Sequence, residues 1–324
     1  MLFRSVGSAP FYEMTGQVGV SLFFMITGFL FWGRVLRSRG PLEVVPLYLS
    51  RIRRIVPMYL VSVMMVLAVV AVLSGFSLRT DLFSLVKDLR AWFSFGFMTF
   101  GALNGFSDGH FINPVYWTLA FEWLFYISLP FLSLFAKPPW SFALLVVAPV
   151  FCLHAPVTLN FIAGGVAALL VDKRWLGDQL QRPLWTPVAL AALALAFLAP
   201  SAYAKGSVAA LFVFFLFIVH GNSLFGLLRS PPAKQLGLIS YSFYLVHAIV
   251  VFVVARVTTS FTSIDQLGAS RYWLVAAAAA ALAVVLSSLT YRYVEYPFLS
   301  FRNELPTIWS KSWRTLRLIG RASP

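Results

Sequence analysis

Residues 55–74 read IVPMYLVSVMMVLAVVAVLS, an uncharged apolar run that follows directly after Arg51, Arg53 and Arg54. About twenty such residues are enough to cross a hydrocarbon core about 30 Å thick, and in lipid they must be helical. The whole chain of 324 residues is 60% hydrophobic and 11% charged, with a mean hydropathy of +0.83. A soluble domain carries about 25% charged residues. The sequence therefore predicts an all-α polytopic integral membrane protein and excludes a disordered chain or a disulfide scaffold.

Ten segments have the length and composition of candidate spans. They lie near residues 17–36, 55–74, 91–104, 114–136, 141–155, 158–171, 184–200, 207–228, 236–257 and 272–291. The arginine-rich connection after the first segment and the basic tail are both expected in the cytoplasm, which requires an odd number of crossings. The sequence thus predicts about nine transmembrane helices, with one of the short segments, 91–104 or those between 141 and 171, failing to cross.

Three regions are expected along the chain. Residues 1–16 form an extramembrane segment that is neither an export signal nor a helix, residues 17–300 form the transmembrane domain, and residues 301–324 form a basic cytoplasmic tail. The net charge of +14 is concentrated at the ends of apolar runs and in this tail. Such placement is typical of membrane topology and of contact with acidic lipid headgroups, and nucleic acid is not an expected partner.

Glu122 is an ionisable residue within the fourth segment, where a charge is costly and marks a functional site or an internal pair. It stands one helical turn before Tyr126, so the spacing predicts a carboxylate beside a phenol, near the indole of Trp117. Two interpretations remain open. Glu122 either contributes to a substrate pocket or pairs with an arginine of a neighbouring helix and fixes packing.

The ninth segment carries a polar stripe of Ser240, Tyr244 and His247, spaced i, i+4 and i+7 on an apolar helix. A histidine beside a hydroxyl could act as a general base, and an interhelical hydrogen bond would explain the stripe equally well. The four histidines of the chain do not have metal-ligand spacing, and no metal site is expected.

The arginines before residue 55 also allow two interpretations. Arg51 and Arg54 are three residues apart, on one face of a helix, and with Arg53 they could hold the phosphates of a nucleotide-bearing donor bidentately. The simpler interpretation is that the three guanidiniums anchor the cytoplasmic end of the span.

Five motifs, in this order along the chain, resemble the acyltransferase 3 family of integral-membrane acyltransferases. They are GVSLFFMITGFL (19–30), RIRRIVPMY (51–59), WTLAFEWLFY (117–126), LGLISYSFYLVH (236–247) and YVEYPF (293–298). They are similar to the family's GVDLFFVLSGFL, R-x-x-R-I-x-P-x-Y, W-S-L-x-x-E-x-x-F-Y, L-G-x-I-S-Y-S-x-Y-L-x-H and E-x-P-F. Ser21, Thr27 and Thr118 depart from these patterns, replacing an aspartate and two serines.

The resemblance implies transfer of an acyl group, commonly acetyl from acetyl-CoA, to a hydroxyl of a carbohydrate, with no permanently bound cofactor. It implies that Arg51, Arg53 and Arg54 contact the anionic donor. The candidate catalytic residues are His247, Glu122 and Tyr126. The residues expected to shape the acceptor or acyl pocket are Trp117, Ser240, Tyr241, Tyr244 and Glu295.

One departure concerns the start of the chain. The family begins one helix earlier, with a basic residue and a histidine regarded as the catalytic base, whereas no histidine precedes His110 here. The family's first helix is therefore expected to be missing, with Met1 an internal methionine or the gene truncated. Restoring that helix would give ten crossings. Without it we expect impaired activity unless His247 replaces the base.

Two other classes of function fit the apolar spans and buried charges. They are a multi-span transporter or flippase for an anionic or glycan substrate, and an inactive relative that acts as a membrane partner. The five motifs in order favour the acyltransferase. On that interpretation the partners are acyl-CoA, a carbohydrate or glycan acceptor and membrane lipid, and the expected location is the bacterial inner membrane.

Overall fold

The computed structural model describes residues 9–38, 43–99, 101–106, 111–134, 156–263 and 267–300. Within these ranges the regular elements are helices, with one isolated bridge between Leu103 and Phe106. The chain divides into two compact units. Unit 1 comprises Met1–Leu42 and Thr118–Gly237, and unit 2 comprises Glu43–Trp117 and Leu238–Pro324.

Five helices of the described ranges are long and apolar enough to span a membrane. They cover Glu13–Arg37, Val44–Leu73, Trp117–Leu134, Pro231–Phe261 and Ala269–Ser300. Shorter apolar helices cover Pro156–Asp172, Pro183–Ala196 and Lys205–Val219. The chain is therefore an all-helical, multi-pass membrane protein, as predicted, whereas the count of nine transmembrane helices is not confirmed.

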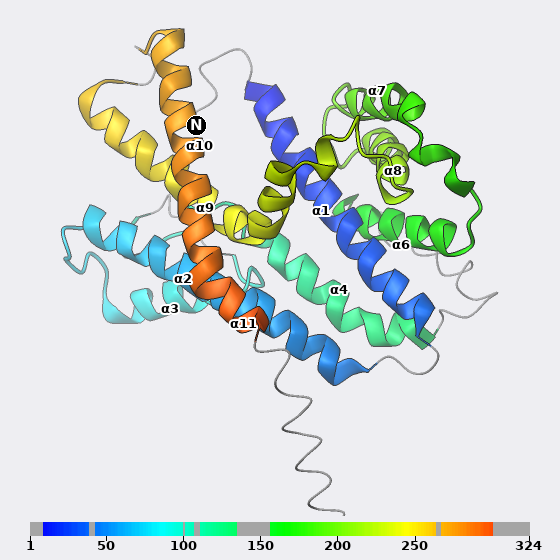
Figure 1. Ribbon diagram of the computed structural model, residues 1–324. Coiled ribbons are helices and arrows are strands. Elements are labelled where there is room, and N and C mark those ends of the chain that lie inside the picture. Colours follow the sequence, from blue (N-terminus) through cyan, green and yellow to red (C-terminus); the bar gives the residue numbers. More distant parts are fainter. Residues whose placement is uncertain are drawn as a thin grey trace, which may run out of the picture. The chain divides into compact units, whose positions relative to one another are not determined.

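Unit 1 is built on the close packing of α1 (Ala9–Arg37) against α6 (Leu159–Asp172), which lie side by side (Figure 1). Glycines make the approach possible. A Cβ atom added to Gly28 would lie 2.2 Å from the carbonyl oxygen of Phe161, and one on Gly164 would lie 2.0 Å from that of Met25. In a membrane, small residues at a helix crossing let two backbones gain van der Waals contact that larger side chains would prevent.

Three more helices belong to unit 1. They are α4 (Trp117–Leu134), most of which lies in this unit, α7 (Thr186–Ala196) and α8 (Lys205–Val219). The helices α7 and α8 pack together through a small core of Ala189, Ala192, Phe214 and Phe217.

Unit 2 contains α2 (Val44–Leu73), α3 (Leu82–Trp92) and α9 (Pro231–Phe261) from Leu238 onward. Its last described elements follow one another without a break. They are α10 (Ala269–Thr290), a π-helical turn (Tyr291–Glu295) and α11 (Tyr296–Ser300). The π-helical turn and α11 pack against α2 (Figure 1), which brings the last sequence motif to the helix that carries the arginines.

Segment 91–104, one of the short segments expected to fail to cross, is helical only through Trp92 in the part that the structure describes. The helix in this region is α3, which begins after Asp81, whose side chain accepts a hydrogen bond from the backbone N–H of Ser84 at 2.9 Å. That bond lowers the pKa of Asp81 and caps the helix. The helix cannot continue past Trp92, because Phe95 and Gly96 adopt positive φ values of 56° and 81°. A Cβ on Gly96 would also lie 2.3 Å from the carbonyl oxygen of Tyr116.

Several helix boundaries also differ from the predicted ones. The first helix begins at Ala9, so part of the segment expected to be non-helical is helical. The second begins at Val44, so the arginines lie inside α2 and not ahead of it. The helix predicted at 207–228 ends at Val219, because Gly221 turns the chain with φ of 100°. The predicted segment 141–155 lies outside the described residues.

Candidate active site

The three arginines lie on α2 and are all half-buried. The guanidinium of Arg54 lies over the ring of Tyr241 of α9, with its central carbon 6.0 Å from the ring centroid. The hydroxyl of Tyr241 donates a hydrogen bond to the backbone carbonyl of Ile55 at 3.1 Å. Two contacts therefore hold Tyr241 beside Arg54. One is the hydrogen bond to Ile55, and the other is the ring–guanidinium contact, whose distance allows a cation–π interaction.

Glu295 belongs to the same cluster in unit 2. Its side chain is 1% exposed, and its Oε2 accepts a hydrogen bond of 2.8 Å from the hydroxyl of Ser242. Glu295 closes the π-helical turn, an element that widens one turn of a helix and is frequent at functional sites. Ser242, Tyr241, Arg54 and Glu295 thus form one polar cluster, which we call the Arg54 cluster.

The polar stripe of α9 has different surroundings at each of its three positions. Ser240 is exposed, whereas Tyr244 and His247 are half-buried. The hydroxyl of Tyr244 donates to the backbone carbonyl of Val115 at 3.3 Å. Nδ1 of His247 lies 3.0 Å from the carbonyl oxygen of Phe243 and 2.9 Å from that of Tyr244. Because a carbonyl oxygen only accepts, Nδ1 carries the proton, and Nε2 keeps the lone pair that a general base needs.

Glu122 and Tyr126 form the predicted carboxylate–phenol pair in unit 1. The hydroxyl of Tyr126 donates to Oε1 of Glu122, and the two side chains are only 1% and 5% exposed, respectively. The ring of Tyr126 contacts that of Phe31 with centroids 4.8 Å apart, and it meets the indole of Trp123 edge to face at 6.2 Å. The indole of Trp123 therefore lies beside the pair, and a place for Trp117 near it stays a prediction.

The predicted site residues are divided between the two units. Unit 2 holds nine of them: Arg51, Arg53, Arg54, Trp117, Ser240, Tyr241, Tyr244, His247 and Glu295. Unit 1 holds Glu122 and Tyr126. The structure brings Arg54 to Tyr241, and it brings Glu295 to Ser242, the residue that follows Tyr241. It places Trp117, half-buried, at the first residue of α4.

Sequence reasoning assigned no role to several polar residues that organise unit 2. The hydroxyl of Tyr59 donates to the carbonyl of Trp92 at 2.5 Å and accepts from the N–H of Phe95 at 3.1 Å. The hydroxyls of Ser62 and Tyr116 lie 2.8 Å apart, and burial raises the pKa of Tyr116. Tyr59 ends the RIRRIVPMY motif and Ser242 lies in LGLISYSFYLVH, so their motifs were the available signal.

Asn113 is another buried residue that sequence reasoning missed. Its side-chain N–H₂ donates a hydrogen bond of 2.8 Å to the backbone carbonyl of Leu245 on α9. The bond lies two residues from Val115, whose carbonyl accepts from Tyr244. The stretch that precedes α4 is therefore bonded to α9 at Tyr244 and Leu245, within one helical turn of His247.

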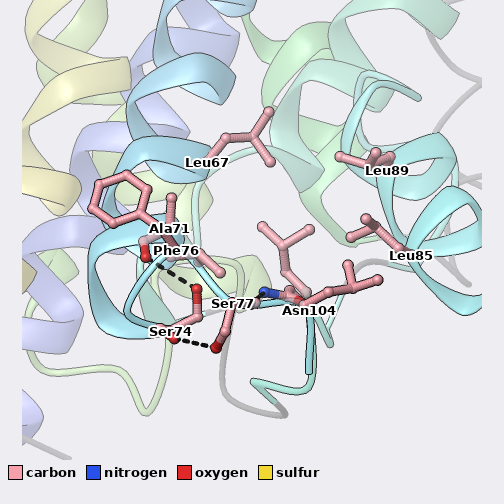
Figure 2. Close-up of a pocket in the computed structure, with 11 residues that line it drawn as sticks. Leu67, Ala71, Ser74, Phe76, Ser77, Leu85, Leu89 and Asn104 are labelled. Atoms are coloured by element: carbon pink, nitrogen blue, oxygen red, sulfur yellow. Dashed lines mark hydrogen bonds between the residues drawn. The ribbon is translucent and has the colours of Figure 1, made fainter. Parts of the chain in front are cut away.

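A pocket of about 420 Å³ lies elsewhere in unit 2, between the end of α2, the following loop and α3 (Figure 2). Most of its lining is apolar, and its polar side chains already donate to backbone carbonyls. Ser74 bonds to Ala71, Ser77 to Ser74, and Asn104 to Ser77. The pocket contains none of the predicted site residues and offers no charge to a phosphate. Its chemistry suits an apolar group, so we do not place the donor there.

The residues that could hold a nucleotide-bearing co-substrate are thus the arginines of α2. Among the described residues no group of three or more histidine, cysteine, aspartate or glutamate side chains could hold a metal ion. These apolar helices position several polar groups. They are the guanidinium of Arg54, a histidine whose Nε2 keeps its lone pair, and two buried carboxylates. Ionisable groups are retained within a membrane only at a cost, so these residues are candidates for a functional role.

The chain belongs to the acyltransferase 3 family and is an O-acyltransferase. The family's sequence model, described as an acyltransferase domain, matches residues 2–292. The exopolysaccharide production protein ExoZ of Rhizobium meliloti (strain 1021) is 29% identical over 283 residues, which cover 79% of this chain and 83% of that relative. No solved structure matches the chain.

Proposed function

We propose that the protein transfers an acyl group, most simply acetyl, from acyl-CoA to a hydroxyl of a carbohydrate at the bacterial inner membrane. The family match over residues 2–292 carries the proposal, because it covers every candidate residue except Glu295. The relative named for exopolysaccharide production supports a carbohydrate acceptor. The acceptor class is therefore a polysaccharide or the oligosaccharide from which it is assembled.

The Arg54 cluster supports a phosphate-bearing donor. A guanidinium offers five N–H donors in a planar fork, which matches phosphate oxygens bidentately. Arg51 stands one helical turn before Arg54, so two forks can engage the several phosphates of coenzyme A. The proposed donor site is at the end of α2 that the arginine-rich connection places in the cytoplasm, where acyl-CoA is available.

His247 is the residue that we assign as general base. It lies six residues beyond Tyr241 on α9, or about 9 Å along the helix axis at 1.5 Å per residue. The pantetheine arm of coenzyme A is longer than this, so a donor whose phosphates lie at Arg54 can carry its thioester to the level of His247. Nε2 would accept the proton of the acceptor hydroxyl while the hydroxyl oxygen attacks the thioester carbonyl carbon. The carbon–sulfur bond then breaks, and the coenzyme A thiolate leaves and takes up the proton.

The Glu122–Tyr126 pair supports a role on the acceptor side. Its carboxylate can accept hydrogen bonds from sugar hydroxyls, and the surrounding aromatic rings can pack on the apolar faces of a sugar. A buried carboxylate held by a phenol is also a fixed acceptor, since the hydrogen bond sets its orientation before substrate arrives. We therefore assign donor recognition to unit 2 and acceptor recognition to unit 1.

The test is acyl transfer by the purified protein in proteoliposomes with radiolabelled acetyl-CoA and an oligosaccharide acceptor. We expect release of the coenzyme A thiol and labelling of the sugar, both dependent on the acceptor. Uptake of the label into sealed vesicles without any ester formed would instead identify a transporter and overturn the proposal.

A further inference from the structure

The pocket between α2 and α3 has no role in the transfer described above, and the two ends of its lining differ in character. Ser74, Ser77 and Asn104 lie at one end, joined by hydrogen bonds, whereas Leu67 and Leu89 lie at the other (Figure 2). The three polar side chains already donate to backbone carbonyls of the protein, so a ligand meets a polar surface at one end and hydrocarbon along the rest. Such a lining matches an amphiphile, which has one polar end and an apolar chain.

The pocket lies near the membrane surface opposite the arginines of α2. Leu73, the last residue of α2, lies 19 positions beyond Arg54. At 1.5 Å per residue this is a rise of about 28 Å, close to the thickness of a hydrocarbon core, about 30 Å. Because the arginine end is the one expected in the cytoplasm, we expect the loop after Leu73 and α3 at the other interface.

The surface around the pocket is apolar and exposed. Phe76 lines the pocket and is 82% exposed. On α3, Leu82 stands three residues before the lining residue Leu85, on the same face of the helix, and is 69% exposed. With 11 residues α3 is too short to span a bilayer, and its charged side with an exposed apolar side is typical of a helix that lies in the membrane interface. The molecules that meet this surface are therefore lipids.

Arg79 supplies a positive charge beside the polar end of the pocket, although no charged residue lines the pocket itself. Its backbone N–H donates to the side-chain oxygen of Asn104 at 2.9 Å, and its Nη2 donates to the carbonyl of Leu73 at 3.2 Å. These bonds place the exposed guanidinium at the end of α2. A guanidinium has five N–H donors in a planar fork, so the bond to Leu73 leaves others for a phosphate. The neighbouring acid, Asp81, caps α3.

We propose that this pocket binds an acyl chain of a membrane glycerophospholipid, whose phosphate contacts Arg79. The chain lies against the leucines of α2 and α3, and the polar end of the pocket meets the ester region of the lipid. A chain gains little by leaving the bilayer for a pocket of the same apolarity, so the contact between phosphate and guanidinium decides which lipids bind. Because α2 and α3 both line the pocket, the bound lipid joins these two helices.

The first experiment measures lipid binding to the purified protein in detergent by native mass spectrometry. We expect phosphatidylglycerol to bind at least tenfold more tightly than diacylglycerol, which lacks the phosphate, or glycerol phosphate, which lacks the chains. Equal binding of phosphatidylglycerol and diacylglycerol would overturn the proposal. A preference for a polyprenyl phosphate over phosphatidylglycerol would identify a lipid carrier as the occupant and would also overturn it.

The second experiment repeats the measurement with variants at the two ends of the site. Arg79→Gln should weaken phosphatidylglycerol binding roughly tenfold and leave diacylglycerol binding unchanged, whereas Arg90→Gln, at an exposed arginine of α3, should change neither. Leu85→Trp fills the pocket and should abolish binding, with Phe83→Trp, at an exposed residue outside the lining, as its control.

Arg79→Gln leaves the apolar lining intact, so it decides the question even if Leu85→Trp does not fold. Unchanged phosphatidylglycerol binding in Arg79→Gln, or an equal loss in Arg90→Gln, would overturn the proposal. None of these measurements requires acyl transfer, so their outcome is independent of the proposed function.

Discussion

Two carboxylates are buried in the described part of the chain, one in each unit, and they are held in different ways. In unit 1, Glu122 accepts a hydrogen bond from Tyr126, one turn further along the same helix, among packed aromatic rings. In unit 2, Glu295 accepts a hydrogen bond from Ser242, which belongs to another helix. The first pair forms whenever α4 forms, whereas the second requires the tertiary structure. A local pair is suited to a fixed recognition surface, and a bond between two helices helps to hold the packing of unit 2.

The two described histidines allow the same comparison. Nδ1 of His220 in unit 1 lies 2.8 Å from the carbonyl oxygen of Leu216, one turn earlier. Nδ1 of His247 makes the same kind of contact, 3.0 Å from the carbonyl oxygen of Phe243. Both histidines therefore carry the proton on Nδ1. Only His247 lies on the helix that also carries Tyr241 and Ser242 of the Arg54 cluster. The local hydrogen bond sets the tautomer in both cases, so our assignment of His247 as the base rests on its position on α9.

The largest effect is expected from His247→Ala. Loss of a general base typically lowers the rate by 10² to 10⁴, so kcat should fall by that factor while coenzyme A binding is retained. His220→Gln is the control, since this residue has the same local hydrogen bond in the other unit. Single-turnover kinetics at saturating donor would measure the chemical step. Equal losses in the two variants would show that His247 is a structural histidine.

Arg51→Ala is expected to have the next largest effect, on the donor alone. A charge-assisted hydrogen bond contributes about 1.5 to 3 kcal/mol, so the KM for acyl-CoA should rise roughly tenfold to a hundredfold with the acceptor KM unchanged. Arg90→Ala, which removes an exposed arginine of α3 in the same unit, should leave both constants unchanged. A normal donor KM in Arg51→Ala would indicate that the arginines only anchor the cytoplasmic end of the helix and do not bind the donor.

Tyr126→Phe tests the acceptor side with a smaller change. It removes the hydroxyl that holds Glu122, and we expect the acceptor KM to rise about tenfold, with the donor KM unchanged, because a buried partner is lost. Tyr203→Phe, at another tyrosine of unit 1, is the control and should leave the acceptor KM unchanged. An effect of Tyr126→Phe on the donor KM instead would contradict the division of roles between the units.

The smallest effect on transfer by folded protein is expected from Gly164→Ala. The added Cβ would lie 2.0 Å from a backbone oxygen of α1, so α1 and α6 must move apart, at about 1–3 kcal/mol of stability. Gly19→Ala is the control, because no atom lies within 4 Å of an added Cβ there. Thermal unfolding in detergent should show a lower midpoint for Gly164→Ala alone. Equal midpoints would mean that the glycines do not set the α1–α6 distance.

The features that sequence could predict are those that depend on neighbours along one helix. The Glu122–Tyr126 pair follows from i,i+4 spacing, and the long apolar helices follow from their composition. The bond between Ser242 and Glu295 joins residues far apart in the sequence, through a π-helical turn that the apolar pattern does not reveal. The helix α3 was missed because it is short and carries charges such as Lys87, so a search for uncharged apolar runs passes over it.

The most direct test of the account is coenzyme A binding to the purified wild-type protein, Arg54→Ala and Glu122→Gln. The account places donor recognition at the Arg54 cluster in unit 2 and acceptor recognition in unit 1. It predicts that the wild type and Glu122→Gln bind with the same Kd, and that Arg54→Ala binds roughly tenfold to a hundredfold more weakly. Equal binding by all three proteins, or a selective loss in Glu122→Gln, would contradict it.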